Sequence, residues 1–407
     1  MSYVKAHRRQ AGVGSMLAAV LLALLQVACG GGGGGDNSAA PPAASAPTNL
    51  QTVMVGPGAA NGINLLYTSV VVCTPGDTAS CRTIDRVLVD TGSVGLRLLA
   101  SVVPASLRLA QRTTPGGALV ECTQFADGYS WGPVKTADVR LGGETLRSVA
   151  VQIIGDPAYP NVPADCSATG APENTVDTFG SNGVLGIGNF ADDCGDRCAR
   201  STAAGLYYAC SASGCGGTPL PQAQQLQQPV TLMATHNNGV VLRLPAVDAE
   251  GAVGVTGTLV FGIGTETNNG LGTARVYTVN PNTGTLPVTA NGVTYAASFV
   301  DSGSNATFFP STMPRCGSGF YCPASPQTIS ALLQGLNGNN AAFSFTVANA
   351  DEMRTQHPTF GALPRLGGPA FGASAVDLGL PFFFGRSIYT AIEGRQTPGG
   401  VGPYVAF

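Results

Sequence analysis

Two four-residue segments of the chain place an aspartate beside glycine and small hydroxyl residues. The segments are Asp90-Thr91-Gly92-Ser93 and Asp301-Ser302-Gly303-Ser304. Each follows a run of apolar residues that is typical of a buried strand. If the two strands end close together, the two aspartates could act as a general acid and a general base.

The chemistry of such a pair follows from the repulsion between its charges. Two carboxylates about 3 Å apart do not both ionise readily, so one pKa is raised and one proton is shared. The ionised group can take a proton from water while the protonated group donates to a carbonyl oxygen. This mechanism hydrolyses an amide bond with no metal and no cofactor, and we expect neither here.

The residues after each aspartate suit this role. Gly92 and Gly303 allow a tight turn that brings backbone N–H groups near the carboxylates. Thr91 and Ser302 can form hydrogen bonds across the interface and lock the two loops together. A simpler interpretation is that both segments are ordinary turns, in which aspartate and glycine are common.

Two further hydroxyl groups can tune the aspartates. Ser93 and Ser304 can donate to the carboxylate oxygens and so favour the ionised form. This effect favours a working range at acidic pH.

The elements that must hold these loops are mostly strands. The chain has 56 glycines, and only 11% of its 407 residues are charged, which is typical of a turn-rich β protein. Its length favours two domains or lobes. Strands are expected at residues 65–73, 86–89, 134–141, 149–154, 239–244, 257–263, 274–279 and 293–300. Short helices are expected only at residues 221–235 and 325–336.

A weak internal duplication connects the two loops. Each loop follows an apolar strand, and each has an apolar-apolar-glycine segment further along the chain, ending at Gly186 and at Gly385. The repeat predicts two similar lobes that face each other across a pseudo-two-fold axis.

Together these motifs resemble the pepsin-like aspartic peptidases, over most of the chain after about residue 60. The resemblance implies a mostly β, bilobed fold with an active cleft between the lobes. It makes Asp90 and Asp301 the catalytic pair and threads Gly186 and Gly385 behind their loops. It also implies an extended peptide or protein substrate, and we expect a monomer.

The same family closes a flap hairpin over its substrate. Residues 127–132, Asp-Gly-Tyr-Ser-Trp-Gly, resemble this hairpin. Tyr129 would then be the flap tyrosine, with Trp131 beside it. Alternatively, the two aromatic residues form an ordinary cross-strand pair on the sheet.

The N-terminus has the pattern of a bacterial export signal. Basic residues precede an apolar stretch at about residues 11–27, followed by Ala28 and Cys29. This resembles a lipoprotein signal in which Cys29 is lipidated, and the following Gly30 favours the outer membrane. The layout also resembles an uncharacterised family of bacterial envelope lipoproteins. An ordinary secretory signal is the alternative.

These observations give four expected segments. They are a signal at residues 1–28, a flexible tether at 29–48, an N-terminal lobe at 49–245 and a C-terminal lobe at 246–407. The tether contains six consecutive glycines and cannot bury enough apolar area to fold. The lipid at Cys29 would be the only membrane contact.

The cysteines support export. Besides Cys29 the chain has ten, an even number. Neighbours in sequence suggest the disulfides Cys73–Cys81, Cys194–Cys198, Cys210–Cys215 and Cys316–Cys322, which leaves Cys122–Cys166, although spacing alone does not fix the pairing. Disulfides are typical of an oxidising compartment. A metal site built from Cys194, Cys198, Cys210 and Cys215 is the competing interpretation.

Three functions remain open from the sequence. The first is an endopeptidase. The second is a catalytically inactive envelope module that binds or inhibits a peptide or protein, and the third is a surface adhesin or glycan-binding protein. Nucleic acid is not an expected partner, because no cluster of basic residues follows the first ten residues.

Overall fold

The computed structural model describes residues 48–58, 62–370 and 372–407. Strands account for 44% of the chain and helices for 10%, so the protein is mostly β, as the sequence indicates. The expected signal, Cys29 and all of the expected tether except Thr48 lie outside the described residues.

Within the described residues, eighteen strands form one hydrogen-bonded network. They are β1 (Leu50–Gly56), β2 (Leu65–Cys73), β3 (Cys81–Asp90), β4 (Val94–Leu99), β5 (Ala110–Gln111), β6 (Thr113–Thr114), β7 (Gly117–Gln124), β8 (Gly128–Leu141), β9 (Glu144–Ile154), β10 (Ala171–Pro172), β11 (Gly183–Ile187), β12 (Tyr207–Ser211), β13 (Gly214–Gly217), β14 (Gly239–Arg243), β15 (Val255–Phe261), β16 (Val276–Thr278), β24 (Ser387–Ala391) and β27 (Tyr404–Ala406).

In the same described part of the chain, a second sheet has seven strands and a further sheet has two. The seven are β17 (Leu286–Ala290), β18 (Val293–Val300), β19 (Thr307–Phe308), β20 (Gln327–Gln334), β21 (Asn340–Val347), β22 (Gly367–Gly368) and β23 (Asp377–Leu378). The pair is β25 (Gln396–Thr397) and β26 (Gly400–Val401). The helices are α1 (Ala164–Ser167), α2 (Val176–Phe179), α3 (Asp196–Arg200) and α4 (Ala350–Gln356).

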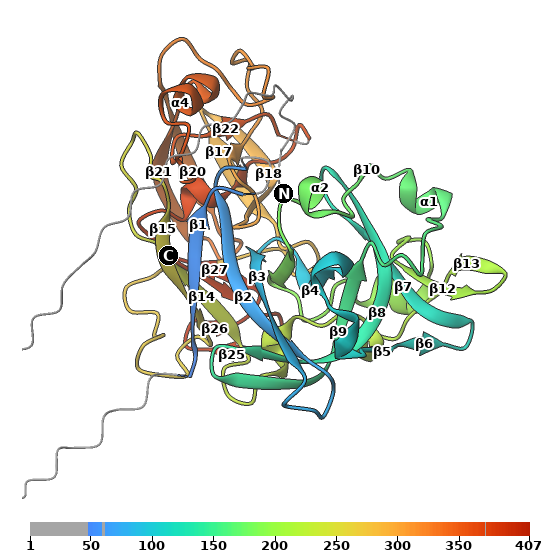
Figure 1. Cartoon of the computed structure of the whole chain (residues 1–407). Coiled ribbons are helices and arrows are strands. Elements are labelled where there is room, and N and C mark those ends of the chain that lie inside the picture. Colours follow the sequence, from blue (N-terminus) through green and yellow to red (C-terminus); the bar gives the residue numbers. More distant parts are fainter. Residues whose placement is uncertain (1–47, 59–61, 371) are drawn as a thin grey trace, which may run out of the picture.

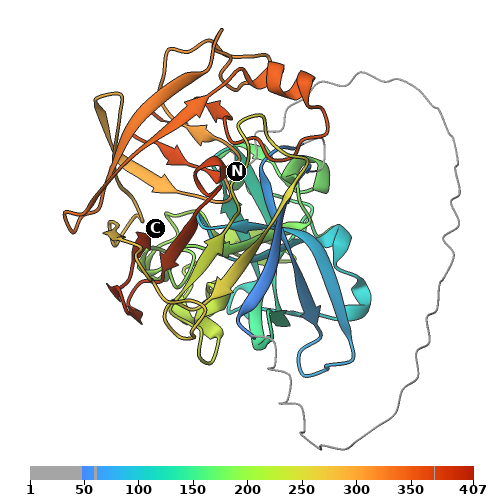
Figure 2. The ribbon, with the colours of Figure 1, turned by 90° about the vertical axis from the view of Figure 1, so that its left-hand side faces the viewer.

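Strands from distant parts of the chain pair in the larger network. β1 pairs antiparallel with β15, and β14 pairs antiparallel with β24. Figures 1 and 2 show β20, β21 and α4, in orange, gathered at one end of the molecule. Strands from both sides of residue 245 therefore share one network, and the division of the chain at that residue stays a prediction.

The expected helix at residues 325–336 is wrong. This segment forms β20, in which the alternate residues Ile329, Ala331 and Leu333 are buried. A burial period of two is that of a strand with one face on the core. The expected helix at residues 221–235 is reduced to two 3₁₀ turns, at Gln222–Gln224 and Pro229–Leu232. Pro229 has no backbone N–H to continue a helix.

The same arrangement of strands surrounds both aspartate loops. β11 runs parallel to β3, which ends at Asp90, and antiparallel to β4, which follows the loop. β23 likewise runs parallel to β18, which ends directly before Asp301, and antiparallel to β19. Each loop therefore connects two strands, and a third strand pairs with both of them.

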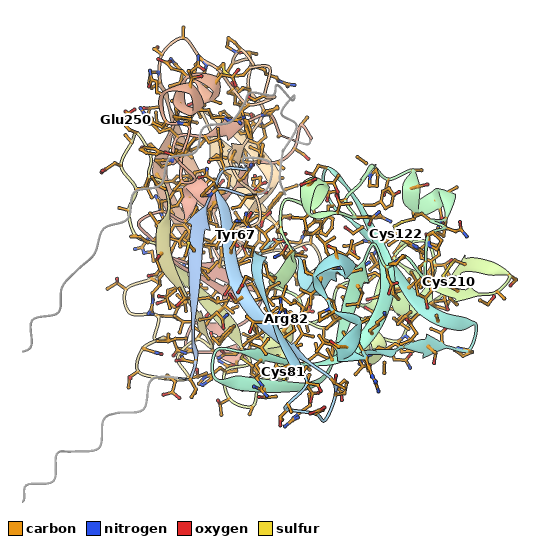
Figure 3. All side chains as sticks on the ribbon, in the orientation of Figure 1. Tyr67, Cys81, Arg82, Cys122, Cys210 and Glu250 are labelled. Atoms are coloured by element: carbon orange, nitrogen blue, oxygen red, sulfur yellow. A yellow bond between two sulfur atoms is a disulfide. The ribbon has the colours of Figure 1, made fainter. Side chains whose placement is uncertain are left out.

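Five disulfides occur among the described residues, and they join the same five pairs of cysteines that the spacing suggests. Figure 3 shows Cys122 and Cys210 in the part of the molecule that contains β7, β12 and β13. Disulfides at this density are typical of an exported protein in an oxidising environment. No helix in the described part of the chain is long and apolar enough to cross a membrane.

The disulfides should differ in their contribution to stability. Cys122 and Cys166 are 44 residues apart, whereas Cys210 and Cys215 are 5 apart. Because a longer closed loop restricts the unfolded chain more, replacing the first pair with alanine should cost about 4 kcal/mol and replacing the second about 2 kcal/mol. Urea unfolding of the two double variants measures the difference. Equal losses would show that restriction of the unfolded chain does not set the contribution.

Candidate active site

The ends of β3 and β18 bring Asp90 and Asp301 together. The two residues are only 1% and 7% exposed. A Cβ atom added to Gly92 would lie 2.6 Å from Cγ of Asp301, and one added to Gly303 would lie 2.6 Å from Oδ1 of Asp90. Each glycine therefore makes room for the carboxyl group of the opposite loop, and a larger residue at either position would displace that group.

Four hydrogen bonds lock the loops to each other. The Thr91 N–H donates to Oγ of Ser302 at 3.1 Å, and the Ser302 N–H donates to Oγ1 of Thr91 at 2.9 Å. The Thr91 hydroxyl donates to the Val300 carbonyl at 3.3 Å, and the Ser302 hydroxyl to the Val89 carbonyl at 2.8 Å. The expected cross-loop bonding is present and is reciprocal.

Each aspartate also accepts hydrogen bonds from its own loop. Asp90 accepts from the Gly92 N–H at 2.7 Å and from the Ser93 hydroxyl at 2.5 Å. Asp301 accepts from the Gly303 N–H at 2.8 Å and from the Ser304 hydroxyl at 2.9 Å. These bonds fix the orientation of both carboxyl groups, and the two serines occupy the positions expected from the sequence.

The pKa of Asp90 is raised, although the hydrogen bond from Ser93 favours the ionised form of this carboxyl group. Burial, the charge of Asp301 and a hydrogen bond to Asp301 together raise the pKa of Asp90 to about 7. The Ser93 hydroxyl lowers this pKa, but its effect is smaller. The pair therefore keeps one proton over the acidic range.

A cavity of about 340 Å³ opens over the two aspartates. Asp90 and Asp301 form part of its wall, together with the apolar side chains of Phe190 and Phe299. Asp377, which the sequence motifs do not indicate, also lines it. An apolar cavity with converging carboxyl groups is the usual form of a binding or catalytic site.

The expected flap residues are wrong. Tyr129 and Trp131 lie further down the hairpin, opposite Gln124 and Cys122. Both are buried in a cluster around the Cys122–Cys166 disulfide, and neither lines the cavity. The hairpin residues that do line the cavity are Thr123, Gln124, Phe125 and Ala126, at the turn between β7 and β8. Phe125 is therefore the aromatic residue of this hairpin that lines the cavity.

One of the two expected threading glycines is also wrong. Gly186 is correctly placed, since a Cβ atom there would lie 2.6 Å from the backbone of Val94. Gly385, however, has only Ala246 nearby. Around the Asp301 loop, the residue that corresponds to Gly186 is Gly379, where an added Cβ atom would collide with the backbone carbonyl of Ala306.

A buried cluster of charged residues supports the cavity wall. Arg97, on β4, donates to Glu121 at 2.6 Å and to Asp193 at 2.9 Å, and all three side chains are at most 4% exposed. Burial lowers the pKa of Arg97, but the two carboxylates outweigh this and raise it overall. Tyr207 completes the cluster by donating to Asp193 at 2.6 Å.

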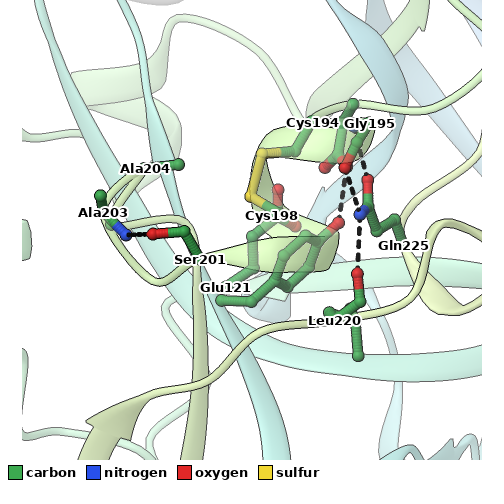
Figure 4. Close-up of a disulfide and its surroundings, with 12 residues drawn as sticks. Glu121, Cys194, Gly195, Cys198, Ser201, Ala203, Ala204, Leu220 and Gln225 are labelled. Carbon is green, nitrogen blue, oxygen red and sulfur yellow. Dashed lines mark hydrogen bonds between the residues drawn. A yellow bond between two sulfur atoms is a disulfide. The ribbon is translucent and has the colours of Figure 1, made fainter.

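The chain segment that carries Asp193 is fixed by a disulfide and by the side-chain amide of Gln225. Figure 4 shows the Cys194–Cys198 disulfide beside Gln225, which exchanges hydrogen bonds of 2.8 and 2.9 Å with the Gly195 backbone. Gln225 also donates to the Leu220 carbonyl at 2.8 Å. Because these cysteines are paired with each other, they are not free thiolates that could bind a metal.

One other group of potential metal ligands occurs among the described residues. It consists of Cys316, Cys322 and Asp351. Cys316 and Cys322 form a disulfide with each other, so this group does not fit a thiolate metal site.

Comparison with known proteins places the chain in a family. Residues 45–407 match the family described as "Protein of unknown function (DUF3443)", and the chain belongs to it. No curated protein matches the chain.

Proposed function

We propose that the protein is an aspartic endopeptidase with a bilobed, pepsin-like fold. The observation that carries the proposal is the reciprocal fit of the two loops, in which each glycine makes room for the carboxyl group of the opposite aspartate. The repeated arrangement of strands around the loops supports two related lobes, at residues 49–245 and 246–407.

The mechanism needs one proton on the pair. Asp90, with its raised pKa, holds this proton and donates it to the carbonyl oxygen of the substrate. The partner carboxylate of Asp301 takes a proton from a water molecule, which attacks the carbonyl carbon to give a tetrahedral intermediate. Asp301 then donates this proton to the leaving nitrogen as the C–N bond breaks, and Asp90 regains its proton from a hydroxyl group of the intermediate. The substrate peptide lies extended in the cavity, beneath the hairpin turn at Phe125, where backbone hydrogen bonds can hold it.

The test is cleavage of a randomised peptide library by residues 49–407 from pH 3 to 9. Pepstatin-sensitive cleavage is the expected result. A folded protein that cleaves nothing over this range would refute the peptidase proposal.

The pH profile of this cleavage should show an alkaline limb. As the pH rises through about 7, Asp90 loses its proton and the pair loses its acid. Above that point kcat/KM should fall about tenfold per pH unit. Because the pKa of Asp90 is higher in the folded state than in the unfolded chain, protonation of Asp90 also stabilises the fold. This contribution is complete below the unfolded pKa of about 3.9 and is lost as the pH rises through about 7. A rate constant that keeps rising to pH 9 would contradict the assignment.

A non-catalytic binding or inhibitor module is the second candidate. It is favoured by Phe125, because the resemblance implies a tyrosine with a hydroxyl group at the tip of the flap, and the aromatic residue here has none. A protein of this kind would bind pepstatin or a peptide in the cavity without turnover.

We also propose that the protein is anchored at the cell envelope, where a lipid at Cys29 holds it to the outer membrane. The sequence pattern at Cys29 and the five disulfides support this location. Labelled palmitate should be incorporated into the intact protein and not into the Cys29→Ser protein. Equal labelling of both would exclude a lipid at this cysteine.

A further inference from the structure

Asp377 is a third buried carboxyl group at the candidate active site. It lies on β23, which runs parallel to the strand that ends before Asp301. Its side chain is 3% exposed and lines the same cavity as Asp90 and Asp301. Asp90 and Asp301 each accept two hydrogen bonds, whereas neither carboxylate oxygen of Asp377 has a partner of normal geometry among the described residues.

The fold does not require a carboxyl group at this position. Asp377 lies opposite Phe299 in the pairing of β23 with β18, two residues before the aspartate of that loop. In the strand arrangement around the Asp90 loop, the matching residue is Val184, which lies opposite Leu88. An apolar side chain therefore suffices at the matching position of the other loop, so the strand pattern itself does not need a carboxyl group here.

Burial of this carboxyl group is unfavourable for its charged form. Burial, followed by the charge of Asp301 and a smaller effect of Asp90, raises the pKa of Asp377 well above its usual range. The Ser304 hydroxyl acts in the opposite direction, but it is outweighed. A ligand that brings a positive charge and N–H donors would remove this penalty.

The carboxyl groups around the cavity favour a cationic ligand. Five aspartates line it. They are Asp90, Asp192, Asp193, Asp301 and Asp377. Arg97 is the only basic residue among the described residues that line the cavity, and its guanidinium is already bound by Glu121 and Asp193. The cavity therefore has an excess of carboxyl groups and no basic group free to neutralise them.

We propose that the part of the cavity wall at Asp377 forms a subsite for a lysine or arginine side chain of the bound peptide. The ammonium or guanidinium group pairs with Asp377, and the aliphatic stem packs on Phe299, which lines the cavity beside it. This inference rests on the proposed function, because it requires a peptide in the cavity. It adds a substrate class, namely peptides with a basic residue next to the bond that is cleaved.

Binding of uncleavable peptides tests the subsite without requiring turnover. The probes are hydroxyethylene peptide analogues in matched pairs, with lysine or norleucine at each position that flanks the isostere. Calorimetry near pH 6 should show that one lysine analogue binds about tenfold or more tightly than its norleucine partner, as for a hydrogen bond to a buried charged group. Binding of that analogue should also release a proton, because pairing ionises Asp377.

Two variants assign the effect to this residue. Asp377→Asn should remove both the preference for lysine and the proton release. Asp192→Asn, at another part of the cavity wall, should keep both. If Asp377→Asn does not fold, Asp377→Val, which copies the matching residue of the strand arrangement around the Asp90 loop, takes its place and should favour norleucine.

The outcomes separate this inference from the peptidase proposal. A lysine preference that depends on Asp377, in a protein that cleaves no peptide, supports the subsite and refutes the peptidase. Cleavage of the library with equal binding of both analogues supports the peptidase and overturns the subsite. The subsite is also overturned if the preference survives in the Asp377 variants, if Asp192→Asn removes it equally, or if no analogue binds.

Discussion

The Asp301→Asn protein is expected to lose peptide cleavage by about 10²–10⁴-fold, with its fold intact. The amide keeps an oxygen that can accept from the Gly303 N–H, so the loop retains its hydrogen bond. It cannot take a proton from water, and general acid–base groups contribute about 10²–10⁴-fold each. Asp90→Asn should cause a loss of the same order, because it removes the acid of the pair. Initial rates on the best library peptide measure both effects.

The matched control is Asp248→Asn. Asp248 is exposed, and it lies outside the cavity. The control should cleave at the normal rate, and circular dichroism should show the same fold for all three variants. If folded Asp90→Asn and Asp301→Asn proteins both cleaved at the normal rate, the two aspartates would not be the catalytic pair.

The Arg97→Met protein is expected to lose much more stability than the Asp90→Asn and Asp301→Asn proteins. Methionine fills a similar volume but leaves Glu121 and Asp193 buried without their cation. Removing one partner of a buried ion pair costs about 3–5 kcal/mol. Urea unfolding at pH 7 should therefore show a large shift of the midpoint to lower concentration.

Two comparisons show whether the loss comes from the buried charges. Arg200→Met removes an exposed arginine that pairs with Asp196, and it should change the free energy of unfolding by less than about 1 kcal/mol. Neutralising both partners of Arg97, in Arg97→Met with Glu121→Gln and Asp193→Asn, should restore much of the loss. If the triple variant were as unstable as the single one, lost packing rather than unpaired charge would be the cause.

The two aspartate loops could be predicted because their chemistry is local. Asp90 and Asp301 are each oriented by a glycine N–H and a serine hydroxyl within three residues. A four-residue motif contains all of these partners, so the sequence alone indicates the arrangement. The internal duplication further indicates that the two loops should meet.

The threading glycine of the second loop could not be identified in the same way. The pattern of two apolar residues before a glycine describes Gly385, while Gly379 follows Asp377 and Leu378. Only the pairing of β23 with β18 shows that Gly379 lies against the second loop. The residue that breaks the apolar pattern is Asp377, so the error in the prediction and the proposed subsite have the same origin.

The flap prediction failed because aromatic side chains alone do not reveal the position of a turn. Tyr129 and Trp131 are the most prominent aromatic residues of the hairpin, but Phe125 lies nearer its tip. The register of β7 against β8, and the disulfide at Cys122, draw Tyr129 and Trp131 into the core. The Arg97 cluster was missed for a related reason, since its partners are distant in the sequence.

The reciprocal bonds between Thr91 and Ser302 limit how the molecule can move. Any opening that separated the two loops would break four buried hydrogen bonds together. The floor of the cavity should therefore behave as a rigid joint, and a peptide cannot be admitted by parting it. We therefore expect any opening to occur at the β7–β8 turn with Phe125, a part of the cavity wall that does not belong to the locked loops. Relaxation-dispersion NMR should then find millisecond exchange at that turn and none at the aspartates beneath it.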